Sequence, residues 1–492
     1  MKDFLKNKLT EKHRWELPRV LLAAAECAPL AKTGGLADVV GTLPKYLADL
    51  GMDARVITPY HRIIKEKFGW RVKHMTDFYI DLGWRHQYVG IEKLVIDGVI
   101  VYLVDNESYY GDKIYRGGMP EGEQYAFFAR AVAEAIPRLD FDPDVLHCND
   151  WHTAMLPMLL KTQYSHAPQG RLRTLLTIHN IAYQGKFGYD YVYDLLGVDA
   201  RYYTSEFMEL DGCANFLKAG CVFSDRINTV SPTYAEEIRT PWYGERLEGI
   251  LSARSHELSG ILNGIDYTTF DPETDPRIPA HFTVDDRSGK TVCKQALIDQ
   301  LGLSISVDTP IVAMVTRMTA QKGFDLVQCV LDELMATEDM AFVLLGSGDA
   351  AYESFMRDAE NRHKGRVCAY LGYNENLANQ IYAGADFLLM PSGFEPCGLS
   401  QMIAMRYGTI PIVRETGGLK DTVQPYNCFT GEGNGFSFAN YSADEMYDTI
   451  LYALGCCSDK KVMRYLIQHA MEADFSFDRS AEAYARLYVC ML

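Results

Sequence analysis

The sequence has no uninterrupted apolar run of about 18 residues, the length that a membrane-spanning helix needs. Its first residues, up to Arg19, are charged and polar and contain no apolar segment typical of a secretion signal. The twelve cysteines include no Cys-x-x-Cys pair, which argues against the usual zinc and dithiol motifs. We therefore expect a cytoplasmic protein whose cysteines are reduced and mostly fill its core.

The sequence also has fewer positively charged residues than negatively charged ones. The chain has 48 Lys and Arg against 65 Asp and Glu, a formal net charge of −17. Nucleic acids and anionic membranes attract basic proteins and repel acidic ones. We therefore expect no nucleic-acid partner and no membrane, and a ligand that is neutral or guided by local charges.

A chain of 492 residues exceeds the size of about 250 to 300 residues at which a single core stops growing. Short apolar runs alternate with helical segments, as in βαβ units with mostly parallel sheets. The runs form two series, at 20–25, 54–58, 99–104, 144–147, 174–178 and 226–230, and at 311–315, 342–345, 367–371, 386–390 and 410–413. A stretch rich in Pro and Asp separates them, so we place the domain boundary near Leu262. The prediction is two α/β domains with doubly wound parallel sheets.

The string Thr-Gly-Gly-Leu occurs twice, at 33–36 and at 416–419, each time after an apolar strand-like run. In open α/β sheets this position lies in the crevice at the carboxyl ends of the strands, where ligands bind. Glycines there let backbone N–H groups approach an anion, and the helix that follows favours a phosphate. The alternative is a plain strand-to-helix turn without a ligand. Lys32 precedes the first copy and adds a cation suited to phosphate, unless it is simply solvated.

Two cations follow the predicted strand at 311–315. Arg317 and Lys322 lie five residues apart, a spacing that can bracket a diphosphate and stabilise it as it leaves. The alternative is a pair of solvated loop cations. Glu395, in the segment 391–400 after another strand, is an acceptor for sugar hydroxyls or a charge that stabilises a helix N-terminus.

Taken in order, the motifs of the chain resemble those of one family. They are KTGGLADV at 32–39, NDWH at 149–152, HNIAYQG at 179–185, NGID at 263–266, RMTAQKG at 317–323, FEPCGLS at 394–400 and TGGL at 416–419. The chain is similar over nearly its whole length to bacterial glycogen synthases and plant-type starch synthases, which are retaining GT-B glycosyltransferases. The resemblance implies two Rossmann-like domains facing a central cleft. They are an acceptor-side domain at 1–262, to which a terminal helix at about 475–492 returns, and a donor-side domain at 263–474.

The resemblance also implies the reaction, which is transfer of glucose from ADP-glucose to the non-reducing end of an α-1,4-glucan such as glycogen. Catalytic roles then fall on His179, Arg317, Lys322 and Glu395. Substrate-binding roles fall on Lys32, Gly34, Gly35, Asp38, Asp150, Asn180, Asn263, Tyr373, Cys397, Gly398, Leu399 and Ser400. Because the two cations neutralise the diphosphate, no metal and no other cofactor is expected.

Several of these residues have ordinary structural interpretations. His179 could be a satisfied histidine at a strand end, Asp150 and Asn263 turn or cap residues, and Tyr373 a packed aromatic rather than a platform for the base. Cys397 needs only to be small. No carboxylate can be assigned as a nucleophile, so a front-face mechanism is the one that the resemblance implies.

The chain departs from the family pattern at three places. Gly393 stands where a larger residue such as Arg is common, Arg246 where Gly is expected, and Phe477 where Trp is usual. The first concerns the donor and the second a loop on the acceptor side. The alternatives that stay open are UDP-glucose as donor, another acceptor, and a non-catalytic glucan-binding regulator.

Overall fold

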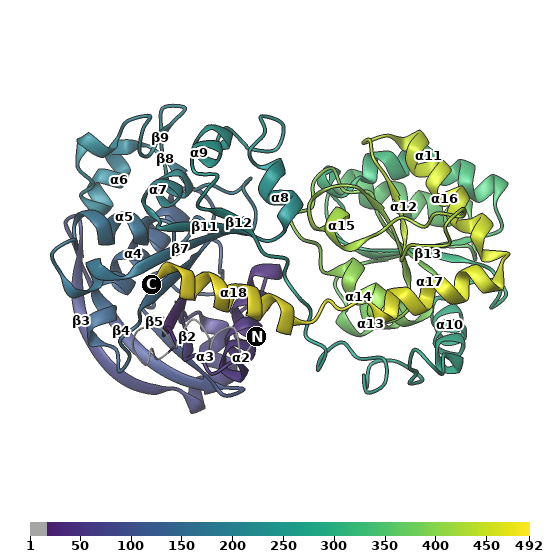
Figure 1. The fold of residues 1–492 in the computed structure, drawn as a ribbon, viewed down its shortest axis with the longest axis horizontal. Coiled ribbons are helices and arrows are strands. Elements are labelled where there is room, and N and C mark those ends of the chain that lie inside the picture. Colours follow the sequence, from purple (N-terminus) through teal and green to yellow (C-terminus); the bar gives the residue numbers. More distant parts are fainter. Residues whose placement is uncertain (1–16) are drawn as a thin grey trace. The chain divides into compact units, whose positions relative to one another are not determined.

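The computed structural model describes residues 17–492 and divides the chain into two compact units. The first runs up to Asn263 and includes Phe477–Leu492, and the second is Gly264–Ser476 (Figure 1). The predicted boundary near Leu262 lies one residue from this division. The polar segment before Leu17, on which the expectation about a secretion signal rests, lies outside the described residues. No helix in the described part of the chain is long and apolar enough to cross a membrane.

The first unit is built on a nine-stranded sheet. In spatial order its strands are β12 (Leu258–Gly260), β11 (Arg226–Thr229), β7 (Arg173–Ile178), β6 (Val145–Asn149), β1 (Val20–Ala23), β2 (Ala54–Pro59), β5 (Val99–Asp105), β4 (Arg85–Ile96) and β3 (Lys73–Leu82). Pairing is parallel from β12 to β5 and antiparallel for the β5–β4–β3 edge. The apolar pattern predicts six of these strands, which are β1, β2, β5, β6, β7 and β11, but it misses β3, β4 and β12. Strand β3 is largely exposed, so it lacks the continuous apolar run of a buried strand.

The helices of the first unit are α2 (Gly35–Asp49), α3 (Arg62–Phe68), α4 (Gly118–Ala135), α5 (Met155–Thr162), α6 (Tyr189–Leu196), α7 (Phe216–Phe223), α8 (Pro232–Glu237) and α9 (Glu248–Ala253). A small antiparallel sheet joins β8 (Lys186–Phe187), β10 (Cys213–Asn215) and β9 (Glu209–Leu210). The last helix, α18 (Phe477–Met491), packs on α2 and lies across this unit in yellow in Figure 1. The hydroxyls of Tyr488 and Tyr484 hydrogen-bond His147 and Asn228 on β6 and β11, at 2.9 and 3.0 Å. The last helix therefore belongs to the first unit.

The second unit has a six-stranded sheet that is parallel throughout. Its order is β15 (Val367–Leu371), β14 (Ala341–Gly346), β13 (Ile311–Val315), β16 (Phe387–Met390), β17 (Ile410–Arg414) and β18 (Phe436–Phe438). The helices are α10 (Ser288–Leu301), α11 (Phe324–Thr337), α12 (Ala350–Arg362), α13 (Glu375–Gly384), α14 (Ser400–Arg406), α15 (Gly417–Thr422), α16 (Ala443–Cys457) and α17 (Lys460–Glu472). The four central strands β14, β13, β16 and β17 are buried on both faces, which is why they read as continuous apolar runs.

Candidate functional site

In the second unit, the segment after β13 carries Arg317 and then a short 3₁₀ turn, η5 (Ala320–Lys322). Gly323 ends this turn with φ +76°, and a Cβ there would lie 2.3 Å from the carbonyl oxygen of Pro391. Only glycine allows both this conformation and this close approach. Gly323 therefore brings the cation-bearing segment against the segment that contains Glu395.

The Glu395 carboxylate is buried, with 7% of the residue exposed, and it has two partners. Its Oε2 lies 2.5 Å from Nζ of Lys322 and accepts a 3.1 Å hydrogen bond from Oγ of Ser392. Arg317, in contrast, is exposed, and its side chain makes no hydrogen bond or ion pair with any other described residue. The two predicted cations therefore differ, because Lys322 is already balanced by a carboxylate and Arg317 is available to an anion.

The second glycine pair, Gly417 and Gly418, packs directly against the segment that contains Glu395. Added Cβ atoms at Gly417 and Gly418 would lie 2.0 and 2.1 Å from the carbonyl oxygens of Glu395 and Cys397. The amide of Gly418 donates to the carbonyls of Glu395 and Pro396, both at 3.2 Å. The repeat predicts an amide open to phosphate here, and that prediction is wrong for Gly418.

Four of the remaining predicted residues of this unit, Cys397, Gly398, Leu399 and Ser400, belong to the same segment. Gly398 has φ +72°, and Leu399 and Ser400 lead into α14. Cys397 is buried, with its carbonyl held by Nε2 of Gln401 at 3.1 Å. Tyr373, in the segment between β15 and α13, is 82% exposed, so its ring is open to solvent and not packed as a core aromatic.

In the first unit, the Thr-Gly-Gly segment closes over a buried carboxylate that the motif search did not single out. Oε2 of Glu26 accepts from the backbone N–H of Thr33 at 2.5 Å and from its Oγ1 at 2.8 Å. Burial raises the pKa of Glu26, while its hydrogen bonds to Thr33, Tyr115 and Gly34 oppose that rise. The segment is thereby fixed, and the Gly34 amide faces Glu26. A signal was available, because Glu26 is a charged residue placed directly after an apolar run.

Lys32 and Asp38, both predicted to bind substrate, are paired with each other. Nζ of Lys32 lies 2.7 Å from Oδ1 of Asp38 in the first turn of α2. The side chains are 47% and 30% exposed, so the pair is open to solvent and weak. Gly35, at the start of α2, is exposed beside them.

The carboxyl ends of β6 and β7 bring Asn149, Asp150 and His179 together. Oδ1 of Asp150 accepts from the backbone N–H groups of His179 at 2.7 Å and Asn180 at 3.4 Å. Asp150 has φ +54°, a conformation that costs a non-glycine residue roughly 1 to 2 kcal/mol. Strain at a residue with this hydrogen-bonding role is typical of functional sites.

The ionisation states at this edge are unusual. Burial raises the pKa of Asp150 to about 7, against the opposing effect of its two backbone donors. Burial lowers the pKa of His179 to about 3, so the ring is neutral near pH 7. Nε2 of His179 lies 2.9 Å from Oδ1 of Asn149. Since that oxygen can only accept, Nε2 carries the proton and Nδ1 is left as an acceptor.

Two further predicted residues lie in the first unit. The side-chain oxygen of Asn180 accepts from the N–H of Ala182 at 3.0 Å, so Asn180 closes a turn. Asn263 is 5% exposed, and its Oδ1 has no hydrogen-bond partner among the described residues. A buried acceptor without a donor is costly unless a ligand supplies one.

The residues that sequence reasoning did not single out are positioning groups: Glu26, Asn149, Tyr115 and Ser392. Asn149 and Ser392 lie in or beside the recognised motifs, whereas Tyr115 is distant in sequence and carries no motif signal. Within residues 17–492 no group of three or more His, Cys, Asp and Glu side chains is arranged to hold a metal ion.

Comparison with known proteins gives this arrangement a family. Residues 19–253 match the model of the starch synthase catalytic domain, and residues 301–470 match that of glycosyl transferases group 1. A glycogen synthase from Geobacillus thermodenitrificans is 52% identical over 471 residues, covering 96% of this chain and 97% of its own length. The chain belongs to the glycogen and starch synthase family. A glycogen synthase from Bacillus anthracis is 48% identical over 474 residues, covering 96% of this chain and 99% of its own length.

Solved structures identify the fold. The catalytic domain of Starch Synthase IV from Arabidopsis thaliana, bound to ADP and acarbose, matches with a TM-score of 0.89 and 32% identity. The match covers 96% of this chain and 99% of that one. A sucrose-phosphate synthase from Thermosynechococcus elongatus shares the fold alone, with a TM-score of 0.61 and 16% identity. The predicted GT-B fold, with parallel sheets in two Rossmann-like units, is confirmed, and the chain is a glycosyltransferase of glycogen synthesis.

Proposed function

We propose that the enzyme transfers glucose from ADP-glucose to the non-reducing 4-hydroxyl of an α-1,4-glucan, with retention at the anomeric carbon. The observation that carries the proposal is the polar cluster after β13, where Arg317 is unpaired and exposed while Lys322 and Ser392 hold a buried Glu395. An unpaired guanidinium offers a bidentate fork to a diphosphate. The carboxylate beside it is an acceptor for sugar hydroxyls.

The donor is proposed as ADP-glucose for two reasons. The Arabidopsis starch synthase that shares the fold at 32% identity was solved with ADP. In this chain Tyr373 presents an exposed ring next to the strand ends of the donor unit, suited to stack on a base. Stacking alone does not discriminate adenine from uracil, so UDP-glucose is the competing donor in the test.

The first unit supplies groups suited to a neutral sugar. The neutral His179 leaves Nδ1 as an acceptor, and Asn263 has an unused buried oxygen. Both groups can accept hydrogen bonds from hydroxyls without the cost of burying a charge. Glu26 holds the Thr-Gly-Gly segment in a single conformation, and Asp150 does the same for the backbone at His179.

Retention follows, in this proposal, from reaction on one face of the sugar. The bond between the anomeric carbon and the diphosphate oxygen breaks, and the acceptor 4-oxygen forms the new bond from the same side. The acceptor proton passes to the departing phosphate oxygen, so that no carboxylate nucleophile is used. Arg317 and Lys322 stabilise the charge that develops on the diphosphate, the role that a divalent metal takes in other transferases. Neither a metal nor another cofactor is part of the proposal.

The deciding experiment is incorporation of labelled glucose into glycogen from ADP-glucose, with EDTA present and UDP-glucose in parallel. Incorporation from ADP-glucose alone supports the donor and the metal-free mechanism. Preference for UDP-glucose would overturn the donor, and loss of activity in EDTA would overturn the mechanism. Release of the label by an enzyme specific for α-1,4 linkages tests retention. No incorporation from either donor would favour another acceptor or a glucan-binding regulator.

A further inference from the structure

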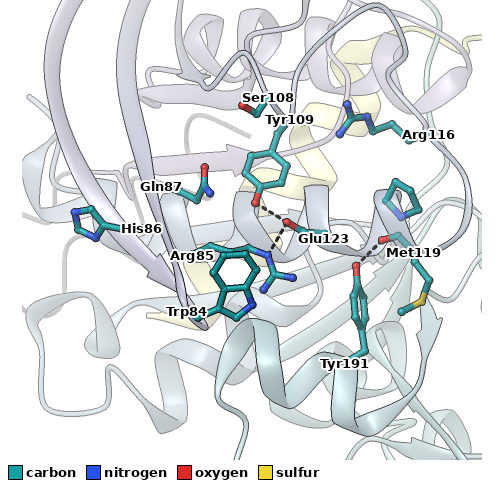
Figure 2. A pocket seen from close by; sticks show the side chains of 11 residues that line it. Trp84, Arg85, His86, Gln87, Ser108, Tyr109, Arg116, Met119, Glu123 and Tyr191 are labelled. Atoms are coloured by element: carbon teal, nitrogen blue, oxygen red, sulfur yellow. Dashed lines mark hydrogen bonds and ion pairs between the residues drawn. The ribbon is translucent and has the colours of Figure 1, made fainter.

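The cavity in Figure 2 and the ends of strands β6 and β7 differ in how their polar side chains are paired. The cavity lies in the first unit and has a volume of about 670 Å³. Figure 2 shows the hydroxyl of Tyr109 and the guanidinium of Arg85 converging on Glu123, at 2.8 and 3.1 Å. At the ends of β6 and β7, in contrast, Nδ1 of the partly exposed His179 has no hydrogen-bond partner among residues 17–492. A side chain with an unused acceptor is the better candidate for a contact with substrate.

The neighbour that holds the other ring nitrogen of His179 is Asn149, the last residue of β6. The amide nitrogen Nδ2 of Asn149 donates to the carbonyl oxygens of Ala23 at 3.2 Å and His147 at 3.3 Å. An amide nitrogen has two hydrogens, so both are used and Oδ1 is the atom left to face His179. Because Oδ1 accepts and cannot donate, Nε2 of His179, at 2.9 Å, carries the proton. The orientation of the Asn149 amide therefore selects the tautomer of the ring.

The opposite orientation of the amide is excluded by the same two contacts. If the amide were turned over, Oδ1 of Asn149 would face two carbonyl oxygens, so that acceptors would meet acceptors. Asn149 is fully buried, and the repulsion would not be screened by water. Ala23 is the last residue of β1, which leads to the segment of Glu26. Asn149 therefore ties the ends of β1 and β6 to the ring of His179.

A second polar contact of the same kind lies one step back along the two strands. Thr177 is the partner of Asn149 in the parallel ladder, so the side chains of His147, Asn149 and Thr177 project from one face of the sheet. Oγ1 of Thr177 lies 2.7 Å from Nε2 of His147, whose Nδ1 lies 2.9 Å from the hydroxyl of Tyr488 on α18. Thr177 is fully buried like Asn149, but its hydroxyl makes no hydrogen bond with His179. It is the matched control for Asn149.

We propose that Asn149 is a positioning residue for the transfer step, which keeps Nδ1 of His179 unprotonated and available to the transferred sugar. The proposal rests on the proposed function, because it assigns His179 a contact with the glucose that is transferred. Positive charge develops on the sugar ring as the bond to the diphosphate breaks. A nitrogen lone pair stabilises that charge, whereas an N–H group in the same place opposes it. The tautomer selected by Asn149 therefore matters more for the transition state than for substrate binding.

The proton on His179 can be located directly, because protonated and unprotonated imidazole nitrogens have well separated ¹⁵N chemical shifts. The full chain is labelled with ¹⁵N-histidine and measured at about pH 8, where the imidazole is neutral. The signals of His179 are assigned by their loss in His179→Gln. We expect the proton on Nε2 in wild type and in Thr177→Val. In Asn149→Leu an Nε2–H group would have lost its acceptor, so we expect the proton on Nδ1. A proton on Nε2 in Asn149→Leu would overturn the proposal.

Kinetics test the role in the transfer step. We expect Asn149→Leu to lower kcat by about 10- to 100-fold and to change the KM for ADP-glucose by less than about twofold. Asn149→Asp is the conservative variant, because its carboxylate still accepts from Nε2 of His179, and it should retain a higher kcat than Asn149→Leu at about pH 8. Thr177→Val loses a buried hydroxyl, so it should melt at a lower temperature but keep the wild-type kcat. Equal losses of kcat in Asn149→Leu and Thr177→Val would overturn the positioning role.

Failure of this proposal and failure of the proposed function give different results. The ¹⁵N shifts are measured without donor or glucan, so they report the tautomer whether or not the protein transfers glucose. A proton that moves from Nε2 to Nδ1 in Asn149→Leu, without incorporation from either donor by the wild type, would overturn the proposed function and leave the tautomer assigned to Asn149. Incorporation at the wild-type kcat by Asn149→Leu would overturn the positioning role and leave the proposed function standing.

Discussion

The two copies of the Thr-Gly-Gly-Leu sequence, one in each unit, differ in how closely they are packed. In the first copy Thr33 and Gly35 are exposed, and a Cβ on Gly34 would meet nothing closer than 3.8 Å. In the second copy Thr416 is fully buried, and Cβ atoms on either glycine would lie about 2 Å from a backbone carbonyl. The first copy is an open segment resting on a carboxylate, and the second is a packed support for Glu395.

The difference teaches that a repeated motif predicts a backbone shape more surely than a ligand. Both copies follow a parallel strand and begin a helix, as their glycines predict. What distinguishes them is the neighbouring segment, since the second copy is covered by residues 395–397 and the first is not. In the proposed function, the diphosphate contacts of the second unit fall to Arg317 and Lys322, which the motif does not contain.

The largest expected effect compares one predicted cation from each unit, Arg317 and Lys32. Arg317→Ala removes an unpaired guanidinium, so we expect kcat to fall by about 10²- to 10³-fold, the cost of losing one preorganised charge stabiliser. Lys32→Ala removes a cation already paired with Asp38 and should cost less. Initial rates with saturating glycogen measure both, and the exposed Arg464→Ala is the matched control. A larger loss for Lys32→Ala would reverse the assignment.

Alanine at one glycine of each copy, Gly418 and Gly34, tests the comparison directly. Gly418→Ala places a Cβ 2.1 Å from the carbonyl of Cys397, an overpacking that costs about 1 to 3 kcal/mol. Gly34 has an extended backbone with φ −153°, which any residue adopts, so Gly34→Ala should leave the free energy of unfolding within about 0.5 kcal/mol of wild type. Differential scanning calorimetry measures both. Similar melting temperatures for the two variants would show that the second segment is not a packed support.

The pH dependence of stability probes the buried carboxylate of the first unit. Burial raises the pKa of Asp150 to about 7, above the value of about 3.9 in an unfolded chain. Between these values the native state holds the extra proton, so Asp150 lowers stability as the pH rises from about 4 to 7. Relative to wild type, Asp150→Asn should therefore gain stability as the pH rises from about 4 to about 7, because the amide does not titrate.

Urea unfolding followed by tryptophan fluorescence suits this measurement, because the four tryptophans among the described residues (Trp70, Trp84, Trp151 and Trp242) lie in the first unit. His179 provides the opposing control. Burial lowers the pKa of His179 to about 3, below the value of about 6.5 in an unfolded chain. The folded state is therefore destabilised relative to the unfolded state as the pH falls from about 6.5 to about 3. Parallel pH profiles for wild type and Asp150→Asn would contradict the raised pKa.

The smallest expected effect concerns Arg246, which occupies a position where the family pattern predicts glycine. Arg246 has φ +72° in a loop where the family pattern predicts Gly, and it pairs with Asp211 at 2.8 Å while 70% of its side chain is exposed. The pair contributes little, whereas the left-handed backbone is strained. Arg246→Gly should therefore raise the free energy of unfolding by about 0.5 kcal/mol. Arg201→Gly, at an exposed residue without a positive φ, should lower it. Destabilisation of Arg246→Gly would show that the ion pair outweighs the strain.

A second departure from the family pattern, Gly393, has room for a Cβ. A Cβ on Gly393 would lie 3.5 Å from the Tyr441 ring, an ordinary contact. The carbonyl of Gly393 accepts a 2.6 Å hydrogen bond from Nη1 of Arg414, which fixes the backbone of this segment. The glycine therefore removes a side chain near Glu395 without displacing the residues that hold it.

The sequence by itself determined the two α/β units and the boundary between them. These follow from local patterns, since fully buried parallel strands must be apolar and the turns after them need glycine. The exposed β3–β4 edge escaped this reasoning, because strands open to solvent lack the pattern. The order of the motifs also pointed to the synthase family without reference to tertiary contacts.

Only the tertiary structure decided which charges are free. Lys322 meets Glu395 across 73 residues of sequence, while Arg317 close by meets no described partner. Oδ1 of Asn149 meets Nε2 of His179 across 30 residues of sequence, and Gly323 brings the segment of Lys322 against Pro391. The physical reason is common to all of these. Ion pairing, pKa and close backbone approach depend on distances of a few ångströms between segments that are remote in sequence, and packing alone sets those distances.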